Sequence, residues 1–218
     1  MVYAGIQADP LVARVAALLA EASPDQRVMA RAVMTGETVD PEGWRIMFPT
    51  LFAAPEGPDA AADLARSEAL LASALLVADR GDEIRNQLRG AIVEAVTERL
   101  LVARVGAASV RRERRILFDG VRAEIHPYDV TVERDGSSEA YDCKWGARGI
   151  NADVLNQLDD ARTHAADEDE RLVVALVVFD ARLSCDVRLA QQTAPTEGIG
   201  LVSLESLSSL AEAPGRAS

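Results

Sequence analysis

The chain has little of what marks a secreted or membrane-bound protein. Its 218 residues include two cysteines, Cys143 and Cys185, which are too few for a disulfide framework and indicate a reducing cytoplasm. No apolar run reaches the roughly 18 residues that a transmembrane helix needs, so no membrane span is expected. The first residues also lack a basic stretch followed by an apolar segment, so no secretory signal is predicted.

Several motifs of common enzyme classes are missing too. There is no P-loop, no glycine-rich dinucleotide fingerprint and no G-x-S-x-G elbow. The two histidines, His126 and His164, have no zinc-ligand spacing to the cysteines, and we expect His126 to be packed or hydrogen-bonded. These absences argue against nucleotide-binding, serine-hydrolase and zinc-dependent classes.

Lysine is the scarcest charged residue. Lys144 is the single lysine among 23 basic residues, so its position can reflect a need for a compact ammonium group. The net charge of −12 argues against a surface that coats nucleic acid. However, six arginines against two acids lie between Arg104 and Arg122, so a local basic patch is compatible with the acidic whole.

Periodicity divides the chain into a helical region, residues 1–81, a core, residues 82–210, and a flexible tail, residues 211–218. In the first region we expect helices after Asp9-Pro10, after Ser23-Pro24 and from a cap at Asp59, with an irregular stretch from Thr38 to Pro58. The core is expected to hold helices 82–105 and 151–166, a short helix from Glu205, and strands at 116–118, 121–128, 130–133, 140–145, 172–179 and 199–204. Asp135-Gly136 is a hairpin signal. The predicted fold class is α/β (α+β).

Acidic residues and the single lysine meet on the predicted hairpin. Asp142 and Lys144 share one face of their strand because side chains alternate, while Cys143 points to the other face. Asp129 begins the preceding strand, so the hairpin can bring two carboxylates to one divalent cation. An ammonium beside them can orient or deprotonate an attacking water, or stabilise the charged transition state.

This order of residues resembles the PD-(D/E)XK nuclease superfamily, the restriction-endonuclease-like fold. The acid is Asp129 in His126-Pro127-Tyr128-Asp129, and the tripeptide is Asp142-Cys143-Lys144. Many members carry a glutamate on the first core helix; Glu94 matches it, and Glu98 is the alternative one turn later. Gln157 is similar to a glutamine that some branches place near the site. The resemblance covers residues 82–205 and implies an αβββαβ core with a central mixed sheet.

The chain departs from the family pattern in two places. Tyr128 stands between Pro127 and Asp129, so the literal Pro-Asp pair is missing. The tyrosine that follows the glutamine in the family is also missing, since Ala161 occupies its place.

The resemblance implies a metal-dependent nuclease, expected to act on DNA as an endonuclease in defence, repair or recombination. Asp129, Asp142, Glu94 and the main-chain carbonyl of Cys143 would hold Mg²⁺ or Mn²⁺, and Lys144 would position the water. The arginine cluster can contact phosphates because guanidinium forks match phosphate oxygens. The apolar helices of the first region predict a homodimer. The arginines concerned are Arg111, Arg112, Arg114 and Arg115.

Two other classes stay open. A nuclease fold kept as an inactive scaffold or interaction protein agrees with the acidic surface, and a helical regulatory protein with an unrelated α+β domain is the third class. Each motif also has a plain structural interpretation: Asp142 and Lys144 as an ion pair in solvent, Asp129 as a turn acid, and Glu94 and Glu98 as a solvated helix face. The arginine cluster can equally be a solvated loop.

Overall fold

The computed structural model describes residues 3–54, 56–116, 127–134 and 136–212. The chain forms two compact units, Met1–Val96 and Thr97–Ser218. The boundary falls inside one continuous helix, α6 (Asp82–Val105), so this helix runs from the first unit into the second.

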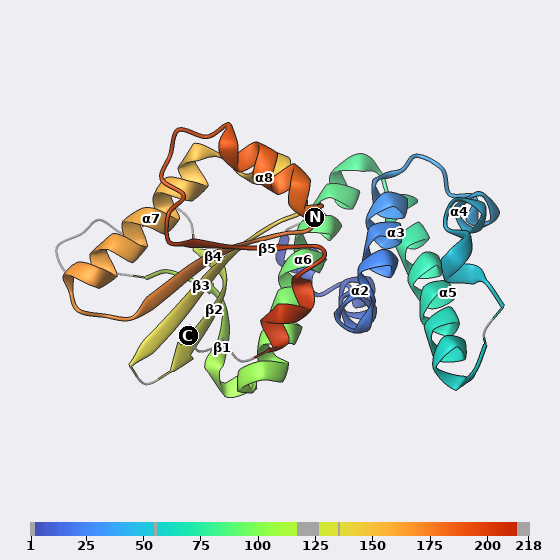
Figure 1. The fold of residues 1–218 in the computed structure, drawn as a ribbon, viewed down its shortest axis with the longest axis horizontal. Coiled ribbons are helices and arrows are strands. Elements are labelled where there is room, and N and C mark those ends of the chain that lie inside the picture. Colours follow the sequence, from blue (N-terminus) through green and yellow to red (C-terminus); the bar gives the residue numbers. More distant parts are fainter. Residues whose placement is uncertain (1–2, 55, 117–126, 135, 213–218) are drawn as a thin grey trace. The chain divides into compact units, whose positions relative to one another are not determined.

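The first unit is helical (Figure 1). Three of its helices begin with the same signal, an acceptor side chain followed by proline. Asp9 Oδ1 accepts from the amide of Leu11 at 2.8 Å, and Ser23 forms a reciprocal capping box with Gln26. Asp40 accepts from the amides of two residues in the next helix. The helices are α1 (Tyr3–Gln7), α2 (Pro10–Glu21), α3 (Pro24–Thr35), α4 (Pro41–Met47), α5 (Pro58–Ala78) and the start of α6, with a 3₁₀ turn η1 (Pro49–Phe52).

Two buried arginines complete the packing of the first unit. Arg27 Nε donates to the carbonyl oxygen of Leu19 near the end of α2, at 3.1 Å. Arg89 Nε donates to the carbonyl of Met34 near the end of α3, at 2.9 Å. Cations at helix C-termini satisfy carbonyls that lack an intrahelical partner and oppose the negative end of the dipole.

The second unit is built on a mixed sheet (Figure 1). Within the described residues it has five strands in the order β1-β2-β3-β4-β5. The pairs β1/β2 and β2/β3 are antiparallel, whereas β3/β4 and β4/β5 are parallel and need helical crossovers. The elements are β1 (Val110–Arg114), β2 (Tyr128–Arg134), β3 (Ser137–Lys144), α7 (Ala152–Asp167), β4 (Leu172–Val178), α8 (Arg182–Ala190) and β5 (Ile199–Ser203), with 3₁₀ turns η2 (Ala107–Ser109), η3 (Ala147–Gly149) and η4 (Leu207–Ala211).

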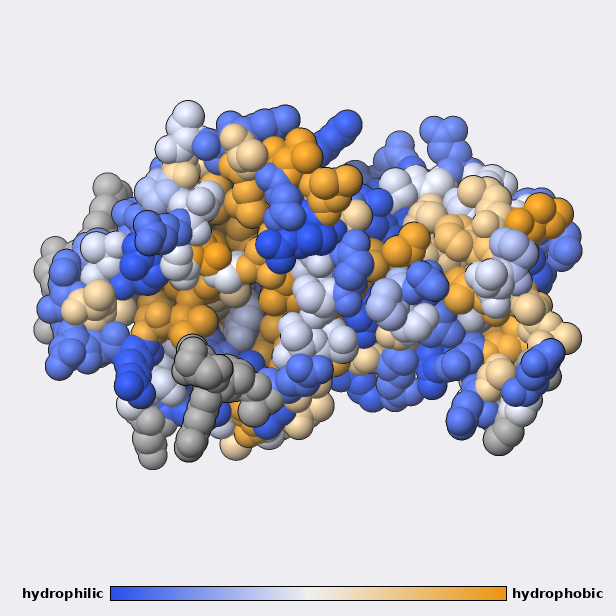
Figure 2. All heavy atoms as spheres, in the orientation of Figure 1, coloured by the Kyte–Doolittle hydropathy of each residue, from blue (hydrophilic) through white to orange (hydrophobic). Residues whose placement is uncertain are grey.

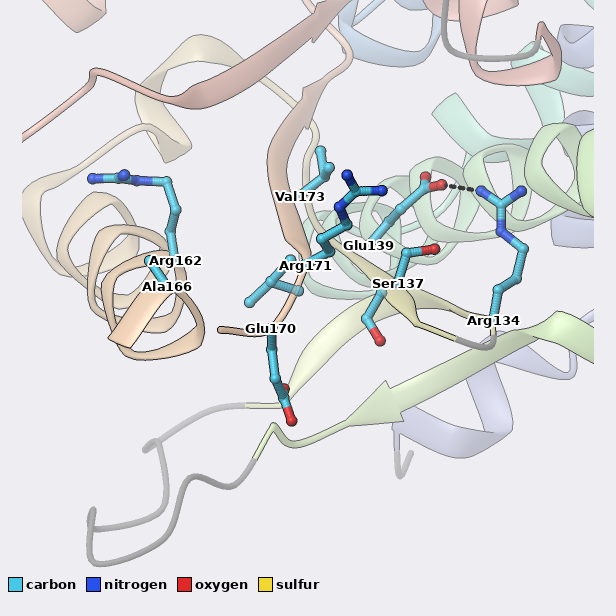
Figure 3. Close-up of a pocket in the computed structure, with 10 residues that line it drawn as sticks. Arg134, Ser137, Glu139, Arg162, Ala166, Glu170, Arg171 and Val173 are labelled. Atoms are coloured by element: carbon cyan, nitrogen blue, oxygen red, sulfur yellow. Dashed lines mark hydrogen bonds and ion pairs between the residues drawn. The ribbon is translucent and has the colours of Figure 1, made fainter. Parts of the chain in front are cut away.

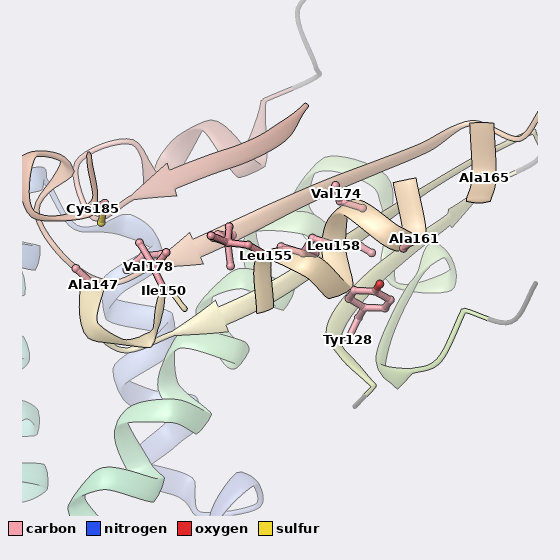
Figure 4. Packing of buried hydrophobic residues seen from close by; sticks show 12 residues of the cluster. Tyr128, Ala147, Ile150, Leu155, Leu158, Ala161, Ala165, Val174, Val178 and Cys185 are labelled. Atoms are coloured by element: carbon pink, nitrogen blue, oxygen red, sulfur yellow. The ribbon is translucent and has the colours of Figure 1, made fainter. Parts of the chain in front are cut away.

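Helices cover both faces of this sheet. Figure 4 shows α7 packed over one face, where Leu155, Leu158 and Ala161 meet buried residues of β3 and β4. On the other face, Thr97 and Arg104 of α6 contact side chains of β3. The helix, three strands, helix, strand order confirms the predicted αβββαβ sequence of elements and the mixed sheet, with α8 added between β4 and β5.

Several sequence predictions need correction. The stretch from Thr38 to Pro58 contains α4 and η1, because Asp40-Pro41 carries the same helix-start signal as the earlier caps. The helix α5 starts at Pro58 after Gly57, so Asp59 lies in its first turn instead of capping it. The short helix expected from Glu205 is the 3₁₀ turn η4, which starts at Leu207.

The strands around the arginine cluster also differ from the prediction. Residues 110–114, for which the sequence predicted no strand and left a phosphate contact or a solvated loop open, form β1. Four of its residues pair with β2: Val110, Arg111, Arg112 and Arg114. Ile116 lies outside any strand. The rest of the predicted strands at 116–118 and 121–128, except Pro127 and Tyr128, lies outside the described residues, as do His126, Asp135 and residues 213–218 of the predicted tail.

Some apolar residues lie at the surface of the second unit. Figure 2 shows apolar spheres gathered over α8, where Leu183 and Val187 are exposed. Among the described residues, no helix is long and apolar enough to cross a membrane.

Candidate functional site

The predicted acids lie on neighbouring strands. Pairing of β2 with β3 runs from Arg134↔Ser137 to Val130↔Tyr141, and Asp129 and Asp142 follow directly beyond this last pair. The amide of Cys143 donates to Asp129 Oδ2 at 2.6 Å. The Asp129 carboxylate therefore lies beside the peptide group that joins Asp142 to Cys143.

Side chains of β3 alternate between the two faces of the sheet. Asp142 and Lys144 are the register partners of Leu176 and Val178, which belong to the cluster beneath α7. Parallel partners share a face, so Asp142 and Lys144 point to the α7 side. Cys143 Sγ lies 3.6 Å from Thr97 Oγ1 of α6, on the opposite side. This is the arrangement that the alternation in Asp142-Cys143-Lys144 predicts.

The Asp142 carboxylate is buried and paired with Lys144. The residue is 7% exposed, and Lys144 Nζ contacts its Oδ1 as an ion pair. The ion pair with Lys144 offsets the cost of burying this carboxylate. A carboxylate has about four acceptor positions, so its oxygens also have room for a cation. The interpretation as an ion pair in solvent does not fit this burial.

The same contacts determine the charge state of Lys144. Burial lowers the pKa of Lys144, but the carboxylates of Asp142 and then Asp129 raise it, and the net direction is upward. The ammonium form is therefore favoured in the arrangement described. Its side chain is 26% exposed, so the charged end can reach solvent or a bound anion.

The donor set fits a hard divalent cation. The oxygens available are the carboxylates of Asp129 and Asp142 and the main-chain carbonyl of Cys143. Mg²⁺ is commonly held by one or two carboxylates while it keeps several waters. Throughout residues 3–54, 56–116, 127–134 and 136–212, no three His, Cys, Asp or Glu side chains gather as a ligand group. The described protein ligands would therefore be two carboxylates and one carbonyl.

The two candidate helix glutamates differ in their contacts. Glu94 lies in the first unit, is buried, and accepts from Gln7 Nε2 at 2.9 Å. Glu98 lies in the second unit and accepts from Arg112 Nε at 2.8 Å. Glu98 is thus engaged with β1, and Glu94 is buried, so the interpretation as a solvated helix face does not fit Glu94. A role of Glu94 at the metal stays a prediction.

Half of the predicted phosphate-binding arginines are engaged in ion pairs. Arg112 pairs with Glu98, and Arg114 Nε lies 3.1 Å from Glu133 Oε1. Arg111 donates to the carbonyl of Val110 at 2.8 Å, and Arg115 has no ion pair among the described residues. Arg111 and Arg115 are therefore the members best able to contact a phosphate.

Gln157 lies on α7, the helix that covers the same face as Asp142. Its main-chain carbonyl accepts from the Tyr128 hydroxyl at 3.3 Å, which ties α7 to β2. Contact of the Gln157 side chain with substrate stays a prediction.

One residue that supports the site was missed from the sequence. Asp180 lies two residues after the end of β4. Its Oδ2 accepts from the amide of Ala147 at 3.0 Å and its Oδ1 from the amide of Ala181 at 2.8 Å. Asp180 thus fastens the turn that follows Lys144. The sequence does carry a signal for it: an acid after a buried parallel strand lies at the edge where the ends of such strands meet.

A cavity of about 440 Å³ lies at the other end of β3 (Figure 3). It is lined by Ser137 to Glu139 and the start of β4, whereas Asp142 and Lys144 lie at the C-terminal end of β3. Arg134 pairs with Glu139, and Arg162 pairs with Asp159. Figure 3 shows the guanidinium groups of Arg162 and Arg171 pointing to different sides, so they do not converge on one ligand position.

Comparisons with known proteins identify the fold alone. No family model matches the chain, and no curated protein matches it. Among solved structures the chain is similar to protein VC1899 from Vibrio cholerae, with a TM-score of 0.50 and 16% sequence identity. The match covers 93% of this chain and 55% of that one, so the chain spans about half the length of VC1899.

Proposed function

We propose that the chain is a metal-dependent nuclease that hydrolyses phosphodiester bonds in DNA. Asp129, Asp142 and the carbonyl of Cys143 would hold Mg²⁺ or Mn²⁺, and Glu94 would assist as a further carboxylate. A divalent ion in such a site lowers the pKa of a bound water and neutralises charge on the phosphate. The proposal rests on the resemblance to PD-(D/E)XK nucleases and on the local geometry of β2 and β3.

One observation carries the proposal: the only lysine of the chain contacts the buried Asp142 carboxylate, and the Asp129 carboxylate lies beside the next peptide group. A buried ion pair is weak evidence for stability, because the cost of removing the charges from water can exceed the gain from their attraction. Two carboxylates and an ammonium group in one place are therefore better explained by a ligand that they hold.

The side chains around the site would have distinct roles in hydrolysis. The Lys144 ammonium donates to the attacking water or to a phosphate oxygen, which orients the water and stabilises negative charge as it develops. Asp129, held by the Cys143 amide, keeps its carboxylate beside the site without a change of conformation on binding. Arg111 and Arg115 add contacts to the phosphate backbone.

Homodimer formation and a cytoplasmic location belong to this proposal as well. Two-fold pairing would present two active sites to the two strands of a duplex. Light scattering at micromolar concentration, with and without DNA, tests the dimer, and a monomer in both conditions would contradict it.

The competing function is a nuclease fold that serves as an inactive scaffold. It is favoured by the absence of a three-ligand group among the described residues and by the net charge of −12. The scaffold gives no reason for the single lysine to lie against a buried carboxylate that has a second carboxylate beside it.

A cleavage assay separates the two functions. Supercoiled, linear and single-stranded DNA, and single-stranded RNA, are incubated with the protein and Mg²⁺, Mn²⁺ or EDTA. The proposal predicts metal-dependent cleavage of DNA that EDTA abolishes and that Asp142→Asn lacks. Asp186→Asn is a matched control, because Asp186 is a half-exposed acid on α8 paired with Arg182. Cleavage of RNA alone would correct the substrate, and no cleavage of any substrate would favour the scaffold.

A further inference from the structure

Gly149 is a glycine whose own backbone does not require it. It is the last residue of η3, the 3₁₀ turn that follows β3, and its φ lies outside the left-handed region. Other residues can adopt this conformation, so the reason for glycine must come from its surroundings.

The neighbour that excludes a side chain at residue 149 is Lys144. A Cβ atom added to Gly149 would lie 2.9 Å from Lys144 Cβ, 2.9 Å from Cδ and 3.0 Å from Cγ. Carbon atoms without a bond between them pack at about 3.5–4.0 Å. The aliphatic part of Lys144 therefore lies flat against the backbone of Gly149.

The turn itself is fixed from the neighbouring strand and helix. The amide of Phe179 donates to the Lys144 carbonyl at 2.8 Å, and Asp180 accepts from the amide of Ala147. Arg188 Nε of α8 donates to the carbonyl of Ile150 at 2.9 Å. Hydrogen bonds on both sides of Gly149 thus fix the backbone of the turn. This backbone is the rigid wall against which the Lys144 side chain lies.

We infer that Gly149 is a positioning residue that directs the Lys144 side chain toward Asp142. A lysine has a flexible four-carbon stem, and a rigid wall along that stem limits where the ammonium can lie. At the stem's end, Nζ contacts Asp142 Oδ1. The catalytic consequence of this role rests on the proposed function, whereas the positioning itself does not.

A methyl group at residue 149 should displace the ammonium. In Gly149→Ala either the Lys144 stem or the turn must move, and a misplacement of about 1 Å at a catalytic group can lower the rate about 10²-fold. We expect kcat to fall by this order. The KM for DNA and the affinity for Mn²⁺ should stay near their wild-type values, since Asp129 and Asp142 are untouched.

The matched control is Gly81→Ala. Gly81 also has an ordinary φ, but a Cβ there meets nothing within 4 Å. This variant adds the same methyl group without contact to Lys144, so kcat and the lysine signals should be unchanged.

The single lysine allows a test that does not depend on activity. Protein labelled with ¹³C and ¹⁵N only in lysine gives one set of side-chain NMR signals, all from Lys144. We expect nuclear Overhauser contacts from the Lys144 Cβ, Cγ and Cδ protons to the Gly149 Hα protons in the wild type. This measurement needs no variant to fold, and the absence of these contacts would overturn the inference.

The variants then separate positioning from the proposed function. Asp142→Asn removes the ion pair and defines the Lys144 Cε and Nζ shifts of a released side chain. Gly149→Ala should move these shifts in the same direction, and shifts equal to those of the wild type would contradict the inference. An inactive wild type would defeat the proposed nuclease while these spectra still decide the positioning. Displaced signals with full kcat would show that Gly149 does not position a catalytic lysine.

Discussion

The two units satisfy buried charge in different ways. In the first unit, Arg27 and Arg89 donate to main-chain carbonyls at the ends of α2 and α3. In the second unit, buried carboxylates meet side chains of opposite charge. Glu139 contacts Arg104, Arg134 and the Tyr141 hydroxyl, whereas Asp142 contacts Lys144.

The comparison shows which buried charge marks a site. Burial alone does not mark a functional site, because the buried arginines of the first unit have clear structural roles as helix caps. An ion pair alone does not mark one either, because both Glu139 oxygens are engaged by donors in a structural network. Asp142 differs from Glu139 because a second carboxylate, Asp129, lies beside it and is held by the amide of Cys143. This second carboxylate distinguishes the candidate site from the network around Glu139, whose described partners are donors.

The largest expected effect comes from Lys144. Lys144→Ala should lower the cleavage rate by about 10²–10³-fold, the usual reduction when one preorganised donor to a developing charge is removed. Lys144→Arg should also be poor, since the guanidinium is larger and cannot lie against Gly149 in the same way. Single-turnover cleavage of a DNA duplex with Mn²⁺ measures both.

The fold should survive these changes at Lys144, and circular dichroism provides the check. Near-normal turnover in Lys144→Arg would mean that the lone lysine is incidental. Such a result would also mean that the Asp142–Lys144 pair, like the Glu139 network, has a structural role only.

The next largest effect should be structural and should come from Glu139. Glu139→Gln leaves Arg104 buried without its full charge partner, which typically costs about 3 kcal/mol of stability. Thermal unfolding followed by Trp145 fluorescence in a Trp44→Phe background reports this unit. Glu68→Gln is the matched control, because Glu68 pairs with Arg45 in the first unit but is only half-buried; the destabilisation should be much smaller there.

The pH dependence of stability gives Glu139 a second test. Burial raises the pKa of Glu139, but hydrogen bonds from Tyr141 and Arg104 and the Arg104 charge lower it, and the net direction is downward. A depressed carboxyl pKa contributes stability above the unfolded value of about 4.3, and this contribution is lost as the pH falls through the folded value. The difference in unfolding free energy between the wild type and Glu139→Gln should therefore shrink below about pH 4. A constant difference down to pH 3 would contradict this assignment.

Local signals in the sequence explain why much of the fold was predictable. Asp9-Pro10 and Ser23-Pro24 start α2 and α3, and Asn151 caps α7. Alternation or enrichment in β-branched residues located β2, β3 and β4. The strand β1 was missed because its arginines suggested a solvated loop, although two of them pair with acids on α6 and β2. The choice of Asp129, Asp142 and Lys144 came from spacing. The burial of Asp142 and the wall at Gly149 depend on contacts with β4 and the η3 turn, which no local pattern encodes.

A smaller effect is expected from Gly36, the counterpart of Gly149 in the first unit. A Cβ on Gly36 would lie 2.7 Å from Trp44 Cζ2, and Trp44 is buried. Gly36→Ala should destabilise the protein by about 1–3 kcal/mol through overpacking. Cleavage at a temperature below unfolding should be unchanged, in contrast to Gly149→Ala. A lower kcat in Gly36→Ala without a change in melting would contradict the separation of packing from catalysis.

The smallest effect concerns DNA affinity. Arg111→Ala with Arg115→Ala should flatten the dependence of log affinity on log salt by about one unit for each phosphate that an arginine no longer neutralises. The matched double variant, Arg112→Ala with Arg114→Ala, should change the slope less, because these arginines are paired with Glu98 and Glu133. Salt titrations with Ca²⁺ in place of Mg²⁺ measure the slopes. Equal slopes in both variants and the wild type would assign all four arginines to solubility.

Metal binding tests the central claim most directly, because it requires no knowledge of the substrate. Titration calorimetry with Mn²⁺ is carried out on the wild type, Asp142→Asn and Glu139→Gln. We predict one Mn²⁺ per chain in the wild type, binding at least about tenfold weaker in Asp142→Asn, and wild-type affinity in folded Glu139→Gln. Equal affinity in the wild type and Asp142→Asn, or no binding at all, would contradict the assignment of Asp142 to a metal site.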